Sequence, residues 1–539
     1  MRKHITTLAF AAVMGFGVAQ SAQRPKLVVG IVIDQMRYDY LYRFKDKFGP
    51  DGFKKLMGEG FVCRNTHYNY VPTYTGPGHA SIYSGTSPSM HGIVGNDWYD
   101  RSLHDSIYCV EDKSVHTLGA EGDAGQMSPK NLLSTTITDE LKLATNKKSK
   151  VIGIALKDRG AILPAGHMAD AAYWFDSNSG SWISSTFYQK DLPQWVKDFN
   201  NRKGVEGYMK DTWSPLLNLE EYKESTADDK PYEGMLGFNE KRRTFPYEIS
   251  KLKGSNYEIL RYTPFGNTFT KDFAKEALWN EGLGKGNQTD FMTVSFSSTD
   301  YIGHTFGPNS MEIEDTYIRL DKDLADLINA LEQQVGKENL LLFLTADHGA
   351  AHVPDYLKEN KISGGVIQSR LLLDSLNRFL KPLFGPGIIS CYINQQIYLN
   401  YPLLDQKHIS AKEVQERIAA FLLRFEGVSG TIMSLTLRGS EFSKGINNMI
   451  YNGFNLKRSG DIIVMLEPGW FEGKLTGTTH GQPYSYDTHV PLIWYGGKIK
   501  KGETVSLVNI VDIAPTLAQL LYLEDPSATT GEPVLDLFR

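Results

Sequence analysis

Leu27-Val28-Val29-Gly30-Ile31-Val32-Ile33-Asp34 is an uninterrupted apolar run that ends at a carboxylate. The run Leu340-Leu341-Leu342-Phe343-Leu344-Thr345-Ala346 ends at Asp347 in the same way, and the stretch from Phe291 to Thr299 leads to Asp300. Near-continuous apolar runs indicate strands that are covered on both faces, and hence a mainly parallel sheet. Because ligands bind beyond the carboxyl ends of the strands in such a sheet, we expect the three acids to meet at one edge.

The rest of the chain alternates strand-like runs with helical stretches. Further strands are expected at Val151–Leu156, Thr293–Ser297 and Val490–Tyr495. Glu314–Val335 has apolar residues at three- and four-residue spacing with acids early, which predicts a helix. Asn509–Thr516 opens another helix that runs through Leu521, with Pro515 in an early-turn position. We therefore predict an α/β fold in which helices flank a mainly parallel central sheet.

Two stretches interrupt this alternation. Residues of about 165–255 are rich in Trp, Tyr, Asn, Ser and charge, and residues of about 355–460 hold a separate mixed set of elements that includes a helix at Ala411–Arg424. A chain of 539 residues is long enough for two to four domains or for one elaborated domain. We interpret residues 23–539 as one domain with two decorating insertions.

The first 22 residues resemble an export signal, with Arg2 and Lys3 followed by an apolar stretch and small residues. We expect this signal peptide to be cleaved and the protein to be periplasmic or secreted; the alternative is a buried N-terminal helix. Removal of Arg2 and Lys3 changes the formal net charge from -5 to -7. This balance provides no footprint for nucleic acid. No later apolar run approaches the roughly 18 residues needed to span a bilayer.

The three cysteines are too few for a disulfide scaffold and too scattered for a thiolate zinc site. In an oxidising compartment Cys63 can pair with Cys109, and buried free thiols are an equally good interpretation.

Acids and histidines form two sets of candidate metal ligands. Asp300 and His304 are four residues apart, a spacing that brings both onto one side of a turn or helix, and His480 is a natural third ligand. Asp34 with Asp347 and His348 supplies a second set of two carboxylates and one imidazole, and Gly349 eases the turn after it. Two such sets predict a two-metal centre. For any single histidine, a structural role remains the alternative.

Thr75 stands in the turn Pro72-Thr73-Tyr74-Thr75-Gly76-Pro77-Gly78-His79-Ala80-Ser81, and Pro77 predicts that a helix begins within a residue or two. A hydroxyl at a helix N-terminus lies among unpaired N–H groups and near the positive end of the dipole, where an anion is favoured. Thr75 is therefore a candidate nucleophile in a phosphate site. The alternative is that it only caps the helix, which is the commoner role of threonine.

In this order, Asp34, Thr75 in T-x-x-G-H, Asp300-x3-His304, Asp347-His348 and His480 resemble the alkaline phosphatase superfamily, in its phosphatase and nucleotide pyrophosphatase/phosphodiesterase branches. The segment DIAPTLAQLL at residues 512–521 also recurs across the superfamily. The resemblance implies that Asp34, Asp347, His348 and Thr75 hold one Zn²⁺, and that Asp300, His304 and His480 hold a second. It also implies that Thr75 attacks phosphorus to form a phosphothreonine intermediate that is then hydrolysed.

Three further residues, Asn96, Lys157 and Arg159, resemble the phosphate-binding trio of PafA-type alkaline phosphatases. A phosphate monoester carries a second negative charge that a diester lacks, so two cations aimed at its oxygens favour the monoester. The alternative for Lys157-Asp158-Arg159 is a solvated surface turn. One departure from the subfamily is Thr75-Gly76-Pro77-Gly78-His79 in place of Thr-Ala-Ile-Gly-His. We expect Gly76 still to offer its N–H to phosphate.

The resemblance therefore implies a secreted zinc-dependent phosphomonoesterase, an alkaline phosphatase that hydrolyses small-molecule phosphate monoesters and releases inorganic phosphate, and we expect a monomer. One alternative is a phosphodiesterase or nucleotide pyrophosphatase on the same two-zinc scaffold. Another is a non-catalytic phosphate-binding protein, which needs no nucleophile. Sulfatase activity is disfavoured because the characteristic C/S-x-P-x-R run is absent. The serine-using metal-dependent phosphoglycerate mutases are disfavoured by the threonine.

Overall fold

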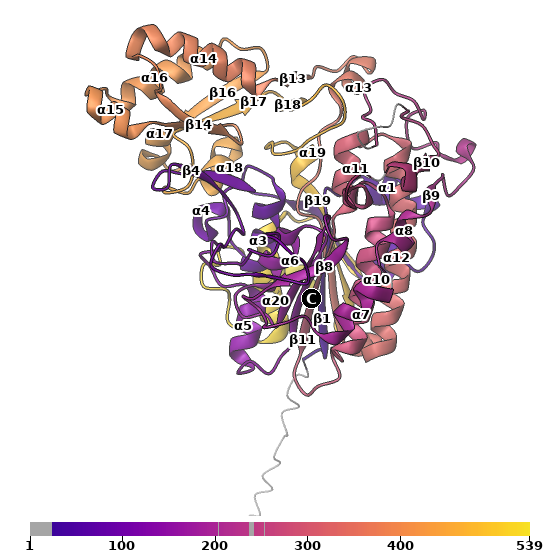
Figure 1. Ribbon diagram of the computed structural model, residues 1–539. Helices are drawn as coiled ribbons and strands as arrows, with labels where there is room; N and C mark the ends of the chain where they lie inside the picture. The colour runs from indigo at the N-terminus through magenta and orange to yellow at the C-terminus, as the bar shows by residue number, and fades with distance from the viewer. Residues whose placement is uncertain (1–23, 203, 237–241, 253) are drawn as a thin grey trace, which may run out of the picture.

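The computed structural model describes residues 24–202, 204–236, 242–252 and 254–539. The expected signal peptide at residues 1–22 lies outside these ranges. The described chain is built around one large mixed sheet, with helices on both faces (Figure 1). Its strands, in spatial order, are β20 (Gly502–Thr504), β2 (Phe61–His67), β19 (His489–Gly496), β12 (Leu340–Thr345), β1 (Leu27–Ile33), β11 (Asp290–Phe296), β6 (Val151–Ala155), β7 (Ala171–Asp176), β8 (Ser181–Ser185) and β5 (Thr117–Leu118), and β21 (Val508–Asn509) also pairs with β2.

The centre of the sheet is parallel, as the apolar runs predict. β1 pairs with β11 and with β12 in parallel, and β11 continues in parallel to β6 and β7. Every residue of β1, β11 and β12 is buried, because helices cover both faces of these strands. The strand expected at residues 490–495 is β19, and it runs antiparallel to β12 and β2. The predicted α/β class is thus confirmed, with antiparallel strands toward the edges.

Two layers of helices cover this sheet (Figure 1). One layer contains α3 (Thr75–Ser84), α5 (Ile137–Ala144), α6 (Asp158–Ala165) and α20 (Ile513–Leu521), and the other contains α7 (Gln194–Arg202), α10 (Phe265–Asn280) and α12 (Met311–Val335). The helix predicted at 314–335 is confirmed as α12, which begins three residues earlier, and the helix predicted to open within residues 509–516 and to run through Leu521 is confirmed as α20. The Ser310 side chain caps α12 by accepting from the Ile313 N–H.

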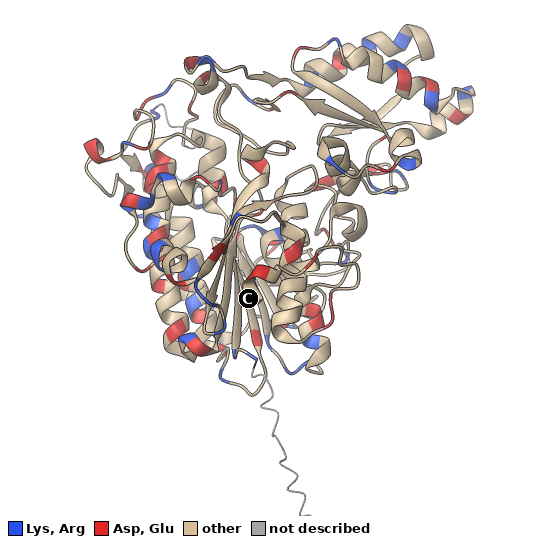
Figure 2. Ribbon diagram, turned by 180° about the vertical axis from the view of Figure 1, so that it is seen from behind, with Lys and Arg blue, Asp and Glu red and all other residues tan. Residues whose placement is uncertain are grey.

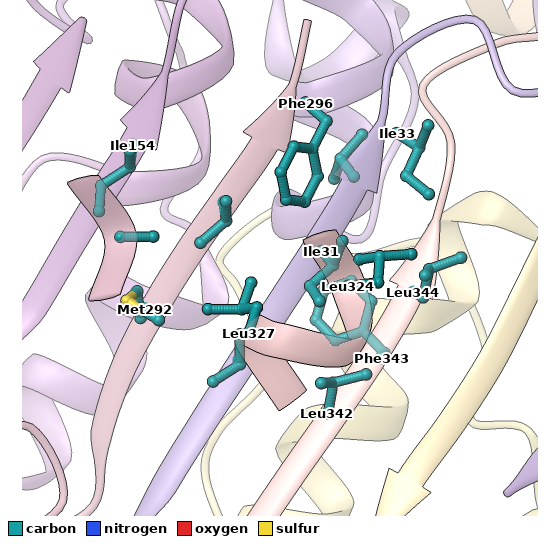
Figure 3. Packing of buried hydrophobic residues seen from close by; sticks show 14 of the residues in the cluster. Ile31, Ile33, Ile154, Met292, Phe296, Leu324, Leu327, Leu342, Phe343 and Leu344 are labelled. Carbon is teal, nitrogen blue, oxygen red and sulfur yellow. The ribbon is translucent and has the colours of Figure 1, made fainter. Parts of the chain in front are cut away.

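The core lies where α12 crosses the central strands. Figure 3 shows Leu324 and Leu327 of α12 against Ile31 of β1 and Leu344 of β12, and all four residues are fully buried. Phe343 of β12 points to the other face, where its ring centre lies 5.8 Å from that of Tyr83 on α3. Successive side chains of the central strands point alternately to the two helix layers, and both faces of the sheet are therefore apolar. This packing fixes where β1 and β12 end, and it therefore fixes the positions of Asp34 and Asp347, which follow these strands.

A second unit lies away from the large sheet (Figure 1, orange). Its four-stranded sheet has the order β14 (Ile389–Ile393), β15 (Gln396–Leu399), β17 (Ile462–Leu466) and β16 (Val428–Met433), and it packs on helices that include α14 (Ser369–Phe384) and α16 (Ala411–Leu422). The helix expected at Ala411–Arg424 is α16 and ends two residues earlier. A separate apolar cluster that includes Leu376, Ile397 and Ile418 holds this unit together.

The remaining elements are short. They comprise α1 (Tyr40–Arg43), α2 (Phe53–Glu59), α4 (Pro88–His91), α8 (Glu206–Met209), α9 (Ile249–Leu252), α11 (Ser298–Phe306), α13 (Pro354–Glu359), α15 (Tyr401–Lys407), α17 (Ser434–Gly439), α18 (Gly445–Gly453), α19 (Ser485–Thr488) and the two-stranded pairs β3 (Asp97–Asp100) with β4 (Asp105–Tyr108), β9 (Thr212–Trp213) with β10 (Tyr247–Glu248) and β13 (Gly365–Ile367) with β18 (Trp470–Glu472).

Three observations bear on environment. Cys63 and Cys109 are buried free thiols, and Cys391 is a half-buried one, so the expectation of free thiols is confirmed and the Cys63–Cys109 bridge is not formed. Among the described residues, no helix has the length and apolar character to cross a membrane. Acidic and basic residues are interspersed along the outer helices (Figure 2).

Candidate active site

Two groups of acids and histidines meet at the carboxyl end of the central strands. We call Asp34, Asp347 and His348 the strand donor group, and Asp300, His304 and His480 the helix donor group. Within each group, one ligand atom from every residue lies within 4.8 Å of the others. The His348 and His480 rings stack with centroids 3.4 Å apart, so the two groups adjoin each other. The six predicted metal ligands are therefore brought together as two sets of three.

The strand donor group is positioned by neighbouring parallel strands. Val32 of β1 is level with Thr345 of β12, so Asp34 and Asp347 follow at the same height. His348 Nε2 lies 3.5 Å from Asp34 Oδ1 and 3.5 Å from Asp347 Oδ2. All three side chains are completely buried.

The helix donor group is built differently from the sequence prediction. β11 ends at Phe296, and Asp300 lies in the first turn of α11, so the expectation that a strand ends directly at Asp300 is wrong. The chain leaves the sheet early because the Thr299 hydroxyl donates to the carbonyls of Asp34, at 2.5 Å, and Phe296, at 3.1 Å. On α11, the four-residue spacing brings His304 Nε2 to 3.1 Å from Asp300 Oδ1.

His480 joins this group from a distant loop. Its Nε2 lies 3.6 Å from Asp300 Oδ1. The loop approaches α11 closely at Gly477, which has φ +73° and where a Cβ atom would stand 1.9 Å from the His304 carbonyl oxygen. Only glycine allows both this backbone angle and this approach.

Backbone carbonyls orient all three imidazoles. The Nδ1 atoms of His304, His348 and His480 lie 2.8, 2.9 and 2.7 Å from the carbonyl oxygens of Thr478, Gly349 and Thr73. Because a carbonyl oxygen only accepts, each Nδ1 carries the hydrogen, and each Nε2 lone pair faces the site. This is the way in which metal-binding histidines are held by their surroundings.

The carboxylates also fit a bound cation. Asp34 Oδ1 and Asp347 Oδ2 are buried and have no hydrogen-bond partner within the described part of the chain. Burial raises the pKa of the Asp34 carboxyl to about 6, and burial together with the Asp34 charge raises the pKa of Asp347 well above its usual value. Burial lowers the pKa of His480 to about 3, which keeps its imidazole neutral. Burial also lowers the pKa of His348, whereas the Asp300 carboxylate outweighs burial and raises the pKa of His304. Imidazoles beside buried carboxylates form a donor set that suits zinc.

Thr75 is the first residue of α3, and it lies beside the strand donor group. The N-cap residue of α3 is Tyr74, so the alternative in which Thr75 caps the helix is wrong. Thr75 Oγ1 is 3.5 Å from His348 Nε2 and 3.5 Å from Lys157 Nζ. The helix packs closely against the strand end, because a Cβ atom on Gly78 would stand 2.4 Å from the Asp347 carbonyl oxygen.

Lys157 connects the two donor groups. Its Nζ lies 2.7 Å from Asp34 Oδ2 and 2.5 Å from Asp300 Oδ2, and the residue is 4% exposed, so the surface-turn alternative for Lys157 is wrong. Burial works to lower the pKa of Lys157, but the Asp300 and Asp34 carboxylates outweigh it and raise the pKa above its ordinary value. The ammonium group is therefore charged.

Asn96 and Arg159 complete the predicted trio around Thr75. The Gly76 N–H donates to Asn96 Oδ1 at 2.8 Å, so the expectation that this N–H is free for phosphate is wrong. Arg159 Nη1 donates to the Tyr108 hydroxyl at 3.0 Å. Tyr108 in turn donates to Asp158 Oδ1, so the guanidinium is held in one orientation.

One residue of the site escaped the sequence analysis. Gln35 directly follows Asp34 and has a left-handed backbone, φ 64°. Its N–H donates to Asp347 Oδ1 at 3.1 Å, and its side-chain Nε2 donates to Asp300 Oδ1 at 2.6 Å. Gln35 therefore contacts both donor groups. Its position after Asp34 is the only sequence signal, and nothing in the residue type points to this role.

A threonine at a helix start between two such donor groups, beyond the carboxyl ends of a mainly parallel sheet, is the arrangement of the alkaline phosphatase superfamily. The type I phosphodiesterase/nucleotide pyrophosphatase family matches residues 28–488, and the chain belongs to this family.

Curated relatives match along nearly their whole length. A protein of Myroides odoratus named calcium-transporting ATPase is 48% identical over 522 residues, covering 96% of this chain and 95% of that protein. Alkaline phosphatase PhoV of Synechococcus elongatus is 46% identical, covering 96% of this chain and 94% of its own. Alkaline phosphatase PafA of Elizabethkingia meningoseptica is 43% identical, covering 98% of this chain and 97% of its own. A crystal structure of alkaline phosphatase PafA matches 96% of this chain and 100% of its own, with a TM-score of 0.94.

Proposed function

We propose that this protein is an alkaline phosphatase that hydrolyses phosphate monoesters with Thr75 as nucleophile and two zinc ions as cofactors. The observation that carries the proposal is the position of Thr75 Oγ1, 3.5 Å from His348 of the strand donor group and 3.5 Å from Lys157, which contacts both groups. The two donor groups would hold the zinc ions, which would supply positive charge that lowers the pKa of a neighbouring hydroxyl and stabilises a departing alkoxide.

The chain's own residues supply the nucleophile and hold the phosphate. Thr75 Oγ attacks phosphorus, the new Oγ–P bond forms, and the P–O bond to the alcohol breaks, so that the alcohol leaves and takes up a proton. The proton that the alcohol takes up balances the one that the Thr75 hydroxyl loses. Water then attacks the phosphothreonine, the P–Oγ bond breaks, Thr75 Oγ takes a proton from that water, and inorganic phosphate is released. The amide of Asn96 and the cations of Lys157 and Arg159 bind the nonbridging oxygens and stabilise the charge that these carry.

Zinc is favoured over the hard cations by the donor chemistry. The helix donor group supplies two imidazoles and one carboxylate, whereas calcium and magnesium prefer sites made of oxygen. The calcium-transport name of one relative therefore finds no support in these donors. Metal analysis of the purified protein is expected to find two zinc ions per chain, and a chelator should abolish turnover until zinc is restored.

The preference for monoesters rests on Arg159, whose half-buried guanidinium is fixed by Tyr108. We expect Arg159→Ala to lower kcat/KM by about 100-fold or more when the substrate is 4-nitrophenyl phosphate, and much less when the substrate is bis(4-nitrophenyl) phosphate. Arg319→Ala is the matched control, because Arg319 is also half-buried and paired with an acid but lies on α12. An equal loss with both substrates, or a wild-type preference for the diester, would favour the phosphodiesterase alternative.

Thr75→Ala separates an enzyme from a phosphate-binding protein. This variant should lose turnover while it keeps its zinc and still binds inorganic phosphate, because none of the six donor side chains is changed. Turnover that survives in Thr75→Ala contradicts the role proposed for the threonine.

We further propose that the protein is exported and that the leader at residues 1–22 is cleaved, which N-terminal sequencing of the mature protein checks. We also propose that the protein is a monomer, which light scattering checks.

A further inference from the structure

A cavity of about 300 Å³ opens beside the two cations that the proposed function assigns to phosphate. Lys157 and Arg159 line it together with Tyr108, Trp174, Tyr301 and Arg261. Its volume lies at the lower end of the range for small-molecule sites. A phosphate held by Lys157 and Arg159 therefore has room next to it for another part of the same substrate.

Arg261 is a third cation in this cavity, and nothing in the phosphate chemistry uses it. It belongs to a 3₁₀ turn at Glu258–Tyr262. Its Nη1 lies 3.0 Å from Glu258 Oε2, and its Nη2 donates to the Phe175 carbonyl at 2.9 Å. Its Nε is buried and has no hydrogen-bond partner among the described residues. The guanidinium is thus fixed in place with donors still free.

Tyr301 links Arg261 to the reacting centre. The guanidinium carbon of Arg261 lies 5.9 Å from the centre of the Tyr301 ring, and Lys157 Nζ lies 5.1 Å from the same centre. Tyr301 directly follows Asp300 of the helix donor group. One aromatic ring therefore lies next to both Lys157, the cation beside Thr75, and Arg261.

The charged groups around the cavity include Glu258, which lies outside the lining and pairs with Arg261. The lining contains three cations, Lys157, Arg159 and Arg261, and two acids, Asp158 and Asp176. Both acids already accept internal hydrogen bonds, Asp158 from the Arg159 N–H at 2.6 Å and Asp176 from the Ser179 N–H at 2.9 Å. Lys157 and Arg159 are assigned to the phosphate that reacts, so Arg261 remains for a second negative group.

We propose that this cavity binds the alcohol portion of the substrate, and that Arg261 selects phosphate monoesters whose alcohol carries a second anionic group, a carboxylate or a further phosphate. A guanidinium is suited to either, because its planar array of donors matches the oxygens of both. The inference rests on the proposed phosphatase activity and adds a substrate class to it. The competing role for Arg261 is a structural tie between the 3₁₀ turn and β7 through the Phe175 carbonyl.

The experiment compares two esters of equal shape, 4-carboxyphenyl phosphate and 4-carbamoylphenyl phosphate. The specificity constant kcat/KM measured with the carboxylate ester is divided by the constant measured with the amide ester, in the wild type and in Arg261→Met. Differences in leaving-group chemistry are the same for both enzymes, so a change in this ratio reports only on the charge. We expect the ratio to fall about tenfold in Arg261→Met, the effect of one hydrogen bond to a charged group, and to recover in part in Arg261→Lys.

Two further variants make the outcome decisive. Arg319→Met is the matched control, because Arg319 is also paired with an acid, donates to a backbone carbonyl at 2.6 Å and lies 5.9 Å from an aromatic ring centre, but is outside the cavity; its ratio should equal that of the wild type. Glu258→Gln removes the carboxylate that pairs with Arg261, so its ratio should rise.

Ratios within twofold of the wild type in both Arg261→Met and Glu258→Gln would overturn the inference and assign Arg261 to structure alone. If Arg261→Met does not fold, Glu258→Gln decides by itself, since an unchanged ratio there has the same meaning. A wild type that hydrolyses neither phenyl phosphate nor the two substituted esters would overturn the proposed function, and this inference with it.

Discussion

The two donor groups hold similar atoms in different ways. The strand donor group comes from the ends of β1 and β12, two hydrogen-bonded parallel strands, and all its side chains are completely buried. The helix donor group takes two residues from one helix and one from a loop more than a hundred positions later, and the His304 side chain is 35% exposed. One group is thus fixed by the core and the other depends on the closure of a loop.

The difference teaches how a single edge of a sheet can serve two chemical tasks. Thr75 lies against the group fixed by the core, so the nucleophile is placed with the least freedom to move. The helix donor group, by contrast, has access to solvent at His304, where a leaving alcohol and an incoming water must exchange. The following predictions test whether this asymmetry between the groups is real.

Removal of one histidine from each group should have unequal consequences. We expect His348→Ala to lower kcat/KM by about 1,000-fold or more, because no solvent reaches that position to replace the imidazole and Thr75 loses its neighbouring charge. His304→Ala should cost less, about 100-fold, because water can take the vacated place. Activity assays and zinc content per chain measure both effects, and His489→Ala outside the site is the control. Equal losses would contradict the asymmetry.

Gln35→Gly should weaken the helix donor group alone. The side-chain bond to Asp300 is lost, whereas the backbone N–H that donates to Asp347 remains, and glycine adopts the φ of 64° without strain. Loss of a residue that orients a metal ligand typically lowers affinity by about 10- to 100-fold. Zinc titration should therefore show one weakened site and one unchanged site. Two weakened sites would mean that Gln35 supports both groups through its side chain.

The rate at which a chelator removes zinc should distinguish the two donor groups in the wild type, without any substitution. We expect zinc to leave in two phases, with the helix donor group several-fold faster because His304 is exposed and the strand donor group has no exposed side chain. In Gln35→Gly only the fast phase should accelerate, and in His348→Ala the slow phase should be missing. A colorimetric zinc indicator follows the release. A single phase in the wild type would show that the two groups exchange alike.

The same asymmetry decides what the sequence could reveal. Asp34 and Asp347 were predictable because an apolar strand points at each, and the pairing of β1 with β12 follows from their burial on both faces. The turn at Asp300 was missed because it depends on hydroxyl contacts of Thr299 to a neighbouring strand. Gln35 and Arg261 could not be predicted from the sequence. Gln35 depends on a left-handed backbone, and Arg261 comes from a segment without periodicity. His304 was predictable from its four-residue spacing from Asp300, and His480 was proposed as the third ligand from its side-chain chemistry, before the resemblance supported both.

The smallest effect concerns the support of the helix that presents Thr75. His91 is buried; its Nδ1 accepts from the Ile93 N–H at 3.1 Å, so its Nε2 carries the hydrogen and donates to Ser81 Oγ of α3 at 2.9 Å. Burial lowers the pKa of His91 to about 3. A histidine whose folded pKa is lowered stabilises the fold fully above its unfolded pKa of about 6.5, and this contribution is lost as the pH falls from there toward 3.

His91→Asn tests this support, because an asparagine oxygen can still accept from the Ile93 N–H but does not titrate. The variant should be less stable than the wild type at pH 7.5, since the bond to Ser81 is lost, and this difference should shrink by about 1 kcal/mol between pH 7.5 and pH 5.5. In a chain of this size that corresponds to a change on the order of 1 °C in the midpoint of thermal unfolding, read by calorimetry with zinc in excess. The other histidines titrate in both proteins and cancel in the difference. A gap that stays constant with pH would mean that the pKa of His91 is the same in the folded and the unfolded protein, and a gap that widens toward pH 5.5 would mean that α3 beneath the strand donor group is held by a protonated His91.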